Sequence, residues 1–230
     1  MENQWMQREA SEAKVAFMQK VYAWMCSALL ITAGVAYASS TSATIINLVF
    51  STGFGILPLI IVEFGLVYYL SRSIDTMSSQ TAKLMFYIYS ALNGVTMAII
   101  FLAYTQASIV STFLITASMF GVMSLYGMYT KKDLSSIGSI AYMAIIGLVI
   151  ASVVNIFLGS SMLYWIISYA GVILFTGLTA YDTQKIQRMY SVMAYDEETA
   201  NKVAILGALS LYLDFINLFL FLLRFFGRRN

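Results

Sequence analysis

The chain has 230 residues, of which 60% are apolar and only 10% are charged, and its formal net charge is +2. Soluble domains carry about 25% charged residues, so this composition excludes a globular domain that faces water on all sides. The apolar residues come in continuous runs rather than in alternation, which disfavours a β-barrel and predicts membrane-spanning helices. The single cysteine, Cys26, excludes an internal disulfide. Without histidine, any metal has to be a hard cation bound by oxygen atoms.

The sequence predicts an all-α, polytopic membrane protein with seven transmembrane helices. The expected spans are residues 21–38, 54–73, 83–104, 108–130, 137–158, 162–184 and 203–226. Residues 1–20 are mixed and amphipathic and lack a signal-peptide cleavage pattern. We therefore expect a cytoplasmic tail over 1–20 and a single transmembrane domain over 21–230. Gly53, Gly55 and Pro58 predict a break before the second span, with Pro58 in the first turn of the crossing helix.

The basic residues predict the orientation. Before the last span, every Lys and Arg falls in the N-terminal tail or near the connections after the second, fourth and sixth spans. The other three loops, near 39–53, 105–107 and 159–161, contain none. The positive-inside rule then puts the N-terminus in the cytoplasm. A complete seventh helix, which we expect, leaves Arg224, Arg228 and Arg229 on the opposite side, against this rule. The alternative is a last segment that returns without crossing, surrounded by protein.

Three acidic residues lie within the predicted spans: Glu63, Asp182 and Asp214. A carboxyl group inside the membrane is costly and is therefore a candidate functional residue. The alternative for Asp182 is a helix-end residue paired with Lys185. The alternative for Glu63 is an interior carboxyl that is hydrogen-bonded to a neighbouring helix.

The last span also carries a narrow polar stripe. Its members recur at helical spacing on one face: Gly207, Ser210, Asp214, Asn217 and Arg224. Such a stripe fits the lining of a buried pathway. For Ser210 and Asn217 the alternative is hydrogen bonding between membrane helices.

Several stretches resemble the Bax inhibitor-1 family, also called the transmembrane Bax inhibitor motif family. LSLYLDFINLFLFLLRFFG at 209–227 is very similar to its terminal signature. AYDTQKI at 180–186 and MSLYGMYTKKDLS at 123–135 resemble its bacterial inner-membrane branch. The resemblance implies a last helix that lies centrally within two layers of three helices.

The same resemblance implies roles for the acidic residues. Asp182 and Asp214 would be paired aspartates that form a pH-sensitive switch over a calcium pathway, and Glu63 an acid that lines it. In some members a basic residue latches one aspartate. Arg72, the nearest candidate here, lies about two positions from the expected place, over half a helical turn away.

The physical chemistry of two adjacent carboxyl groups supports this implied mechanism. In an apolar site such a pair shares one proton, since both groups cannot easily ionise. Once ionised, the pair presents anionic oxygen ligands suited to Ca²⁺. We therefore predict a passive, pH-gated calcium leak channel, without enzymatic activity or cofactor. Its partners would be Ca²⁺, protons, the lipid bilayer and other membrane proteins, but not nucleic acid.

Other functions remain as alternatives. A proton-coupled calcium exchanger is a close variant of the channel. A regulatory protein that binds other membrane proteins, such as a membrane-anchored protease, is a second class. An intramembrane aspartyl protease is more remote. Tyr181-Asp182 matches its Tyr-Asp pair, but Leu-Tyr-Leu-Asp at 211–214 lacks the glycines of its second motif.

The predicted orientation can be tested with topology reporters. We expect a reporter on the N-terminus, or within residues 185–202, to report the cytoplasm, because the basic residues gather there. A reporter after Asn230 should report the outside, since the last helix is expected to cross completely. A periplasmic signal from residues 185–202 would overturn the orientation.

Overall fold

The computed structural model describes residues 2–51, 55–193 and 196–230, and these residues are almost entirely helical. The elements are α1 (Glu2–Ser40), α2 (Ala43–Ile46), the π-helical turn η1 (Asn47–Ser51), α3 (Ile56–Ser73), α4 (Ser79–Ala103), α5 (Gln106–Tyr129), α6 (Ser135–Leu158), α7 (Ser161–Met193) and α8 (Glu197–Phe226). Seven of the helices are long and apolar enough to cross a membrane. The prediction of an all-α, multi-pass membrane protein is confirmed.

The expected break before the second span is present. The short elements α2 and η1 precede α3, and Pro58 is the third residue of α3. A proline fits the first helical turn because its missing N–H has no partner within the helix there. Gly55 directly precedes α3, whereas Gly53 lies outside the described residues.

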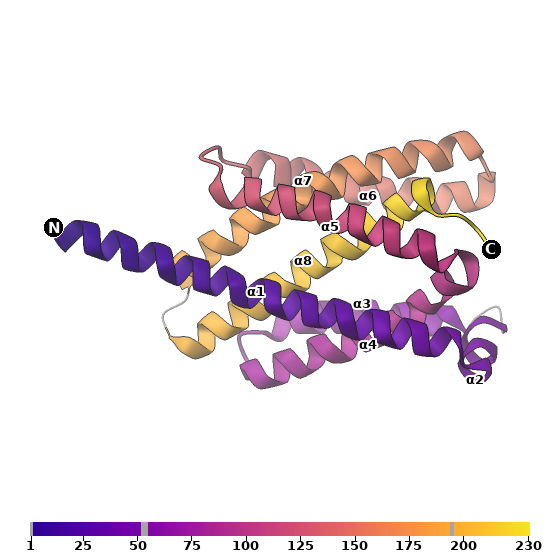
Figure 1. Ribbon diagram of the computed structural model, residues 1–230, viewed down its shortest axis with the longest axis horizontal. Coiled ribbons are helices and arrows are strands. Elements are labelled where there is room, and N and C mark those ends of the chain that lie inside the picture. The colour runs from indigo at the N-terminus through magenta and orange to yellow at the C-terminus, as the bar shows by residue number, and fades with distance from the viewer. Residues whose placement is uncertain (1, 52–54, 194–195) are drawn as a thin grey trace. The chain divides into compact units, whose positions relative to one another are not determined.

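Helix α8 is continuous (Figure 1) and contains 30 residues, so it is about 45 Å long at 1.5 Å per residue. It is also the most buried span. In its most apolar 18-residue stretch 67% of the residues are buried, compared with 44% or less in the corresponding stretches of the other spans. Such burial is required of a central helix. After α8, the backbone N–H of Thr105 donates to the carbonyl of Arg228 at 2.9 Å. This bond holds the C-terminal tail at the α4–α5 connection. It therefore supports a last helix that crosses completely, rather than a last segment that returns to the side from which it entered.

The helices divide into two compact units. Unit 1 contains Met1–Ala103, Ile186–Tyr212 and Asn230, and unit 2 contains Tyr104–Lys185 and Leu213–Arg229. In unit 1, α4 packs against both α1 and α3. The ring of Tyr212, which is fully buried, packs edge-on against Phe86 and Tyr89 at centroid distances of 5.7 and 5.8 Å.

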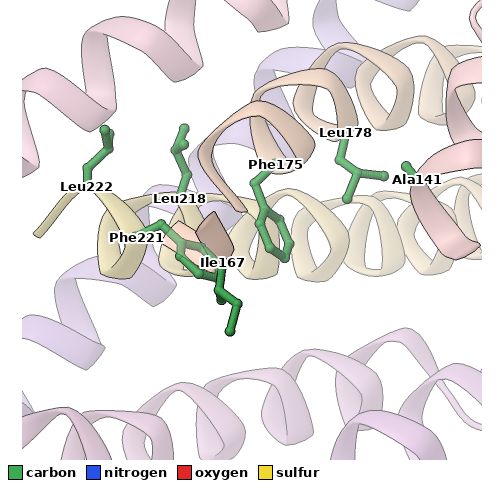
Figure 2. Packing of buried hydrophobic residues seen from close by; sticks show 7 residues of the cluster. All are labelled: Ala141, Ile167, Phe175, Leu178, Leu218, Phe221 and Leu222. Carbon is green, nitrogen blue, oxygen red and sulfur yellow. The ribbon is translucent and has the colours of Figure 1, made fainter. Parts of the chain in front are cut away.

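Unit 2 has its own apolar core (Figure 2), built from α6, α7 and α8. Its buried members are Ala141, Ile167, Phe175, Leu178, Leu218, Phe221 and Leu222. On another side of α7, α5 comes so close that a Cβ atom at Gly127 would overlap the carbonyl oxygen of Ala180. A glycine is therefore needed here for the two helices to approach.

Candidate functional site

Both intramembrane aspartates lie in unit 2, Asp182 on α7 and Asp214 on α8. Their side chains are only 7% and 5% exposed. The two carboxyl groups interact electrostatically with each other, and each also interacts with the positive charge of Lys185. Among the described residues, Asp182 Oδ1 and Asp214 Oδ2 are buried without any hydrogen-bond partner. A buried, unpartnered carboxyl oxygen is expensive, so this arrangement points to a function rather than to stability.

The three residues after Asp182 fasten this turn of α7 to its neighbours. Thr183 Oγ1 lies 3.3 Å from Ser124 Oγ on α5, within hydrogen-bond distance. The Gln184 side chain bonds to the α5–α6 connection: it accepts from the backbone N–H of Leu134 at 3.0 Å and donates to the carbonyl of Lys132 at 2.9 Å. Lys185 Nζ donates to Tyr142 Oη on α6 at 3.3 Å. Asp182 is thus held on a turn with little freedom to move.

Sequence reasoning singled out none of these positioning contacts except Lys185. The signal was present in the run Asp-Thr-Gln-Lys, which puts consecutive polar residues near the end of an apolar helix. Lys185 lies near Asp182, as the helix-end alternative expected, but its hydrogen bond goes to Tyr142.

Glu63 lies in unit 1, on α3, and is 8% exposed. Its carboxyl group accepts from Thr96 Oγ1 at 2.5 Å and from Asn93 Nδ2 at 3.3 Å, both on α4. Both partners are neutral side chains. The arrangement matches the interior carboxyl considered as the alternative for Glu63, and it leaves a lining role open.

The hydrogen bonds continue beyond Asn93. Tyr212 Oη on α8 donates to Asn93 Oδ1 at 3.1 Å and lies 2.7 Å from Thr32 Oγ1 on α1. Thr32 Oγ1 lies 2.9 Å from the carbonyl oxygen of Ser90. This polar network therefore joins α3, α4, α8 and α1 through the buried side chains of Glu63, Thr96, Asn93, Tyr212 and Thr32. Asn93 and Thr96 share one face of α4 at a spacing of three residues, which is the sequence signal that was missed.

The remaining candidates are exposed, half-buried or bonded within their own helix. Arg72 is exposed in the last turn of α3, in unit 1. Ser210 is half-buried on α8, also in unit 1. Asn217 lies in unit 2, where its Nδ2 donates to the carbonyl of Leu213 at 2.8 Å within the same helix.

The described residues contain no cluster of three or more acidic, histidine or cysteine side chains that could hold a metal ion. Asp182 and Asp214 offer two carboxylates, and Glu63 belongs to the other unit. Two carboxylates suit a cation that binds weakly and leaves, rather than a resident metal, which for calcium needs six to eight oxygen ligands.

Comparison with known proteins gives matches over nearly the whole chain. A family described as "Inhibitor of apoptosis-promoting Bax1" matches residues 14–230. The inner membrane protein YbhL of Escherichia coli strain K12 is 50% identical over 215 residues, which cover 93% of this chain and 92% of that protein. An uncharacterized protein of Borreliella burgdorferi is 49% identical, with 94% of each chain covered. One of Rickettsia prowazekii is 45% identical, with 93% of this chain and 90% of that protein covered.

The polar network makes a prediction about stability. Tyr212→Phe removes one hydroxyl and leaves Asn93 Oδ1 and Thr32 Oγ1 short of a partner, so it should destabilise the protein by about 1–3 kcal/mol. Tyr89→Phe is the matched control, because Tyr89 lies beside Tyr212 and no hydrogen bond of its hydroxyl is present among the described residues. Thermal unfolding in detergent should show a lower midpoint for Tyr212→Phe only. Equal midpoints for both variants would contradict the network.

Proposed function

Because the chain belongs to the Bax inhibitor-1 family, we propose that it is a passive calcium leak channel whose opening depends on a proton shared by Asp182 and Asp214. The observation that carries this proposal is the pair of buried carboxyl oxygens without hydrogen-bond partners. Two carboxyl groups that act on each other in an apolar site bind one proton jointly, since a second negative charge there is strongly opposed.

The shared proton would keep the channel closed. A protonated carboxyl donates a hydrogen bond to its ionised neighbour and so joins α7 to α8 in unit 2. Raising the pH removes that proton, and repulsion between two carboxylates replaces the bond. Calcium flux should therefore increase with pH. Protons and Ca²⁺ compete, because both bind the same oxygen atoms.

Nearby charges would tune this switch without replacing it. Lys185 attracts both carboxylates. Its ammonium group donates a hydrogen bond to Tyr142 on α6 and lies 5.9 Å from the ring centroid of Tyr181. A fixed positive charge beside the pair favours the ionised form and keeps it accessible to a divalent cation.

Glu63, Ser210 and Asn217 would line the cation route, and Arg72 is the remaining candidate for a latch. We further propose that the protein lies in a bacterial inner membrane, as its Escherichia coli relative is described, with the N-terminus in the cytoplasm. Proton-coupled exchange and a regulatory role through binding other membrane proteins remain as alternatives. A purely regulatory role should survive loss of both aspartates.

Calcium flux into liposomes tests the switch. Wild-type flux should rise by about tenfold from about pH 5 to about pH 8, because one shared proton is lost in that range. Asp182→Asn and Asp214→Asn should each flatten this profile, since an amide cannot release the proton.

Asp196→Asn is the matched control for these variants. Asp196 lies in the α7–α8 connection, where hydrogen bonds from the backbone N–H and hydroxyl of Thr199 hold the pKa of its carboxyl below the usual range. It stays ionised throughout the series, so its variant should keep the wild-type profile. If both membrane variants keep that profile too, the aspartate pair is not the switch.

Glu63→Gln separates the route from the switch. If Glu63 lines the cation path, flux should fall at every pH while the midpoint stays near that of the wild type, because a charged ligand is lost. If Glu63 only joins helices, flux should barely change. A shifted midpoint with unchanged maximal flux would contradict our separation of the two. Unfolding should be recorded in parallel, since Gln keeps one oxygen to accept from Asn93 Nδ2, while its amide nitrogen would replace the acceptor of Thr96 Oγ1.

A further inference from the structure

Two threonine hydroxyls in unit 2 are, like the aspartate oxygens, buried without a hydrogen-bond partner among the described residues. Among the described residues, Thr112 Oγ1 on α5 and Thr176 Oγ1 on α7 are buried and make no hydrogen bond. The whole Thr112 side chain is 0% exposed. A hydroxyl is both a donor and an acceptor, and a buried one nearly always has a partner.

Neighbouring threonines on α5 and α7 do form hydrogen bonds, so the helical backbone itself does not prevent a threonine hydroxyl from finding a partner. Thr116 on α5 donates to the carbonyl of Thr112 at 2.8 Å. On α7, Thr179 and Thr183 donate to the carbonyls of Phe175 and Thr179, each at 2.8 Å. Threonine in a helix usually satisfies its hydroxyl in this way, on the carbonyl one turn earlier. Thr112 and Thr176 make no such bond among the described residues.

The two hydroxyls belong to facing helices. Thr183 on α7 bonds to Ser124 on α5, so this face of α7 is turned toward α5. Thr176 lies seven residues before Thr183, two helical turns away, and therefore on the same face. Phe175 and Leu178 point instead into the apolar core drawn in Figure 2.

The hydroxyls also lie at successive depths from the aspartates. Thr176 precedes Asp182 by six residues, which is about 9 Å along α7. Thr112 precedes Ser124, the residue beside Thr183, by twelve residues, about 18 Å along α5 and about a third of a turn around it. It lies on the buried face of α5 that also includes Gly127, which abuts Ala180 of α7. Thr112 itself follows the first residue of α5, Gln106, by about 9 Å. The unpartnered oxygens are thus spaced between the aspartate pair and the far end of α5.

We propose that Thr112 and Thr176 line a hydrated path between α5 and α7 that leads from Asp182 and Asp214 to the Gln106 end of α5. Its ligands are water molecules, which bridge unpartnered oxygens separated by several ångströms, and the hydrated cation or proton that moves with them. The identity of the moving ion rests on the proposed function, whereas the presence of water does not. The path gives a buried carboxyl pair the contact with solution that a pH switch needs.

Thiol accessibility tests the path without reference to transport. Cys26 is the only cysteine, so a Cys26→Ala background allows single Thr→Cys variants to be labelled. Thr112→Cys and Thr176→Cys should react with a small water-soluble methanethiosulfonate at least about tenfold faster than their matched controls, because the reagent reaches only hydrated thiols. The controls are Thr116→Cys and Thr179→Cys, which replace fully buried residues whose hydroxyls are bonded to their own helices. Equal rates at all four positions would overturn the path.

Calcium flux provides the second arm. Thr112→Val and Thr176→Val remove the hydroxyls at nearly unchanged shape and should lower wild-type flux severalfold, while Thr116→Val should not. If the wild type conducts and all three Val variants match it, the inference fails and the proposed function stands. If the wild type carries no calcium but the thiols react as expected, the proposed function fails and the hydrated path remains.

Discussion

The interior of this protein is governed by the cost of a polar group without a partner. Lipid supplies no hydrogen bonds, so a buried carboxyl or hydroxyl has to be satisfied by the protein or by water. Unit 1 meets this demand around Glu63, whose carboxyl accepts from Thr96 and Asn93 in a network that continues to Tyr212 and Thr32. Unit 2 leaves oxygens of Asp182 and Asp214 without partners among the described residues. The same chain thus contains one satisfied membrane carboxyl and two with an oxygen that has no partner among the described residues.

The contacts around the pair indicate which helix would respond to its charge. Thr183 and Gln184 tie α7 to α5 and to the α5–α6 connection by hydrogen bonds. Near Asp214, α8 instead packs through the ring of Phe215 against rings of α5. Apolar contacts have no fixed direction and tolerate small displacements better than hydrogen bonds do. Repulsion between the two carboxylates should therefore move α8 more than α7. The far end of α8 is anchored again, by Arg224 against Tyr164 and Ser168.

Apolar runs and charge counts predicted all seven spans, because about 20 continuous apolar residues have few alternatives to a membrane helix. The predicted boundaries were too short for α1, α7 and α8, whose polar ends, such as residues 2–20 of α1, continue the helix beyond the apolar core. Pro58 correctly marked the start of α3, because its backbone restriction is local. The network through Tyr212 could not be predicted, since it depends on which faces of four helices meet. The missing partners of Thr112 and Thr176 depend on side-chain orientation, which residue type alone does not determine.

Infrared difference spectroscopy tests the shared proton most directly, because a protonated carboxyl and a carboxylate absorb at different frequencies. The measurement compares wild-type protein with the Asp182→Asn/Asp214→Asn double variant over a pH series. At low pH the difference should contain a carboxylic acid band from the pair, and this band should give way to carboxylate absorption as the pH rises. A pair that is fully ionised at every pH, with no acid band in the difference, would contradict the account.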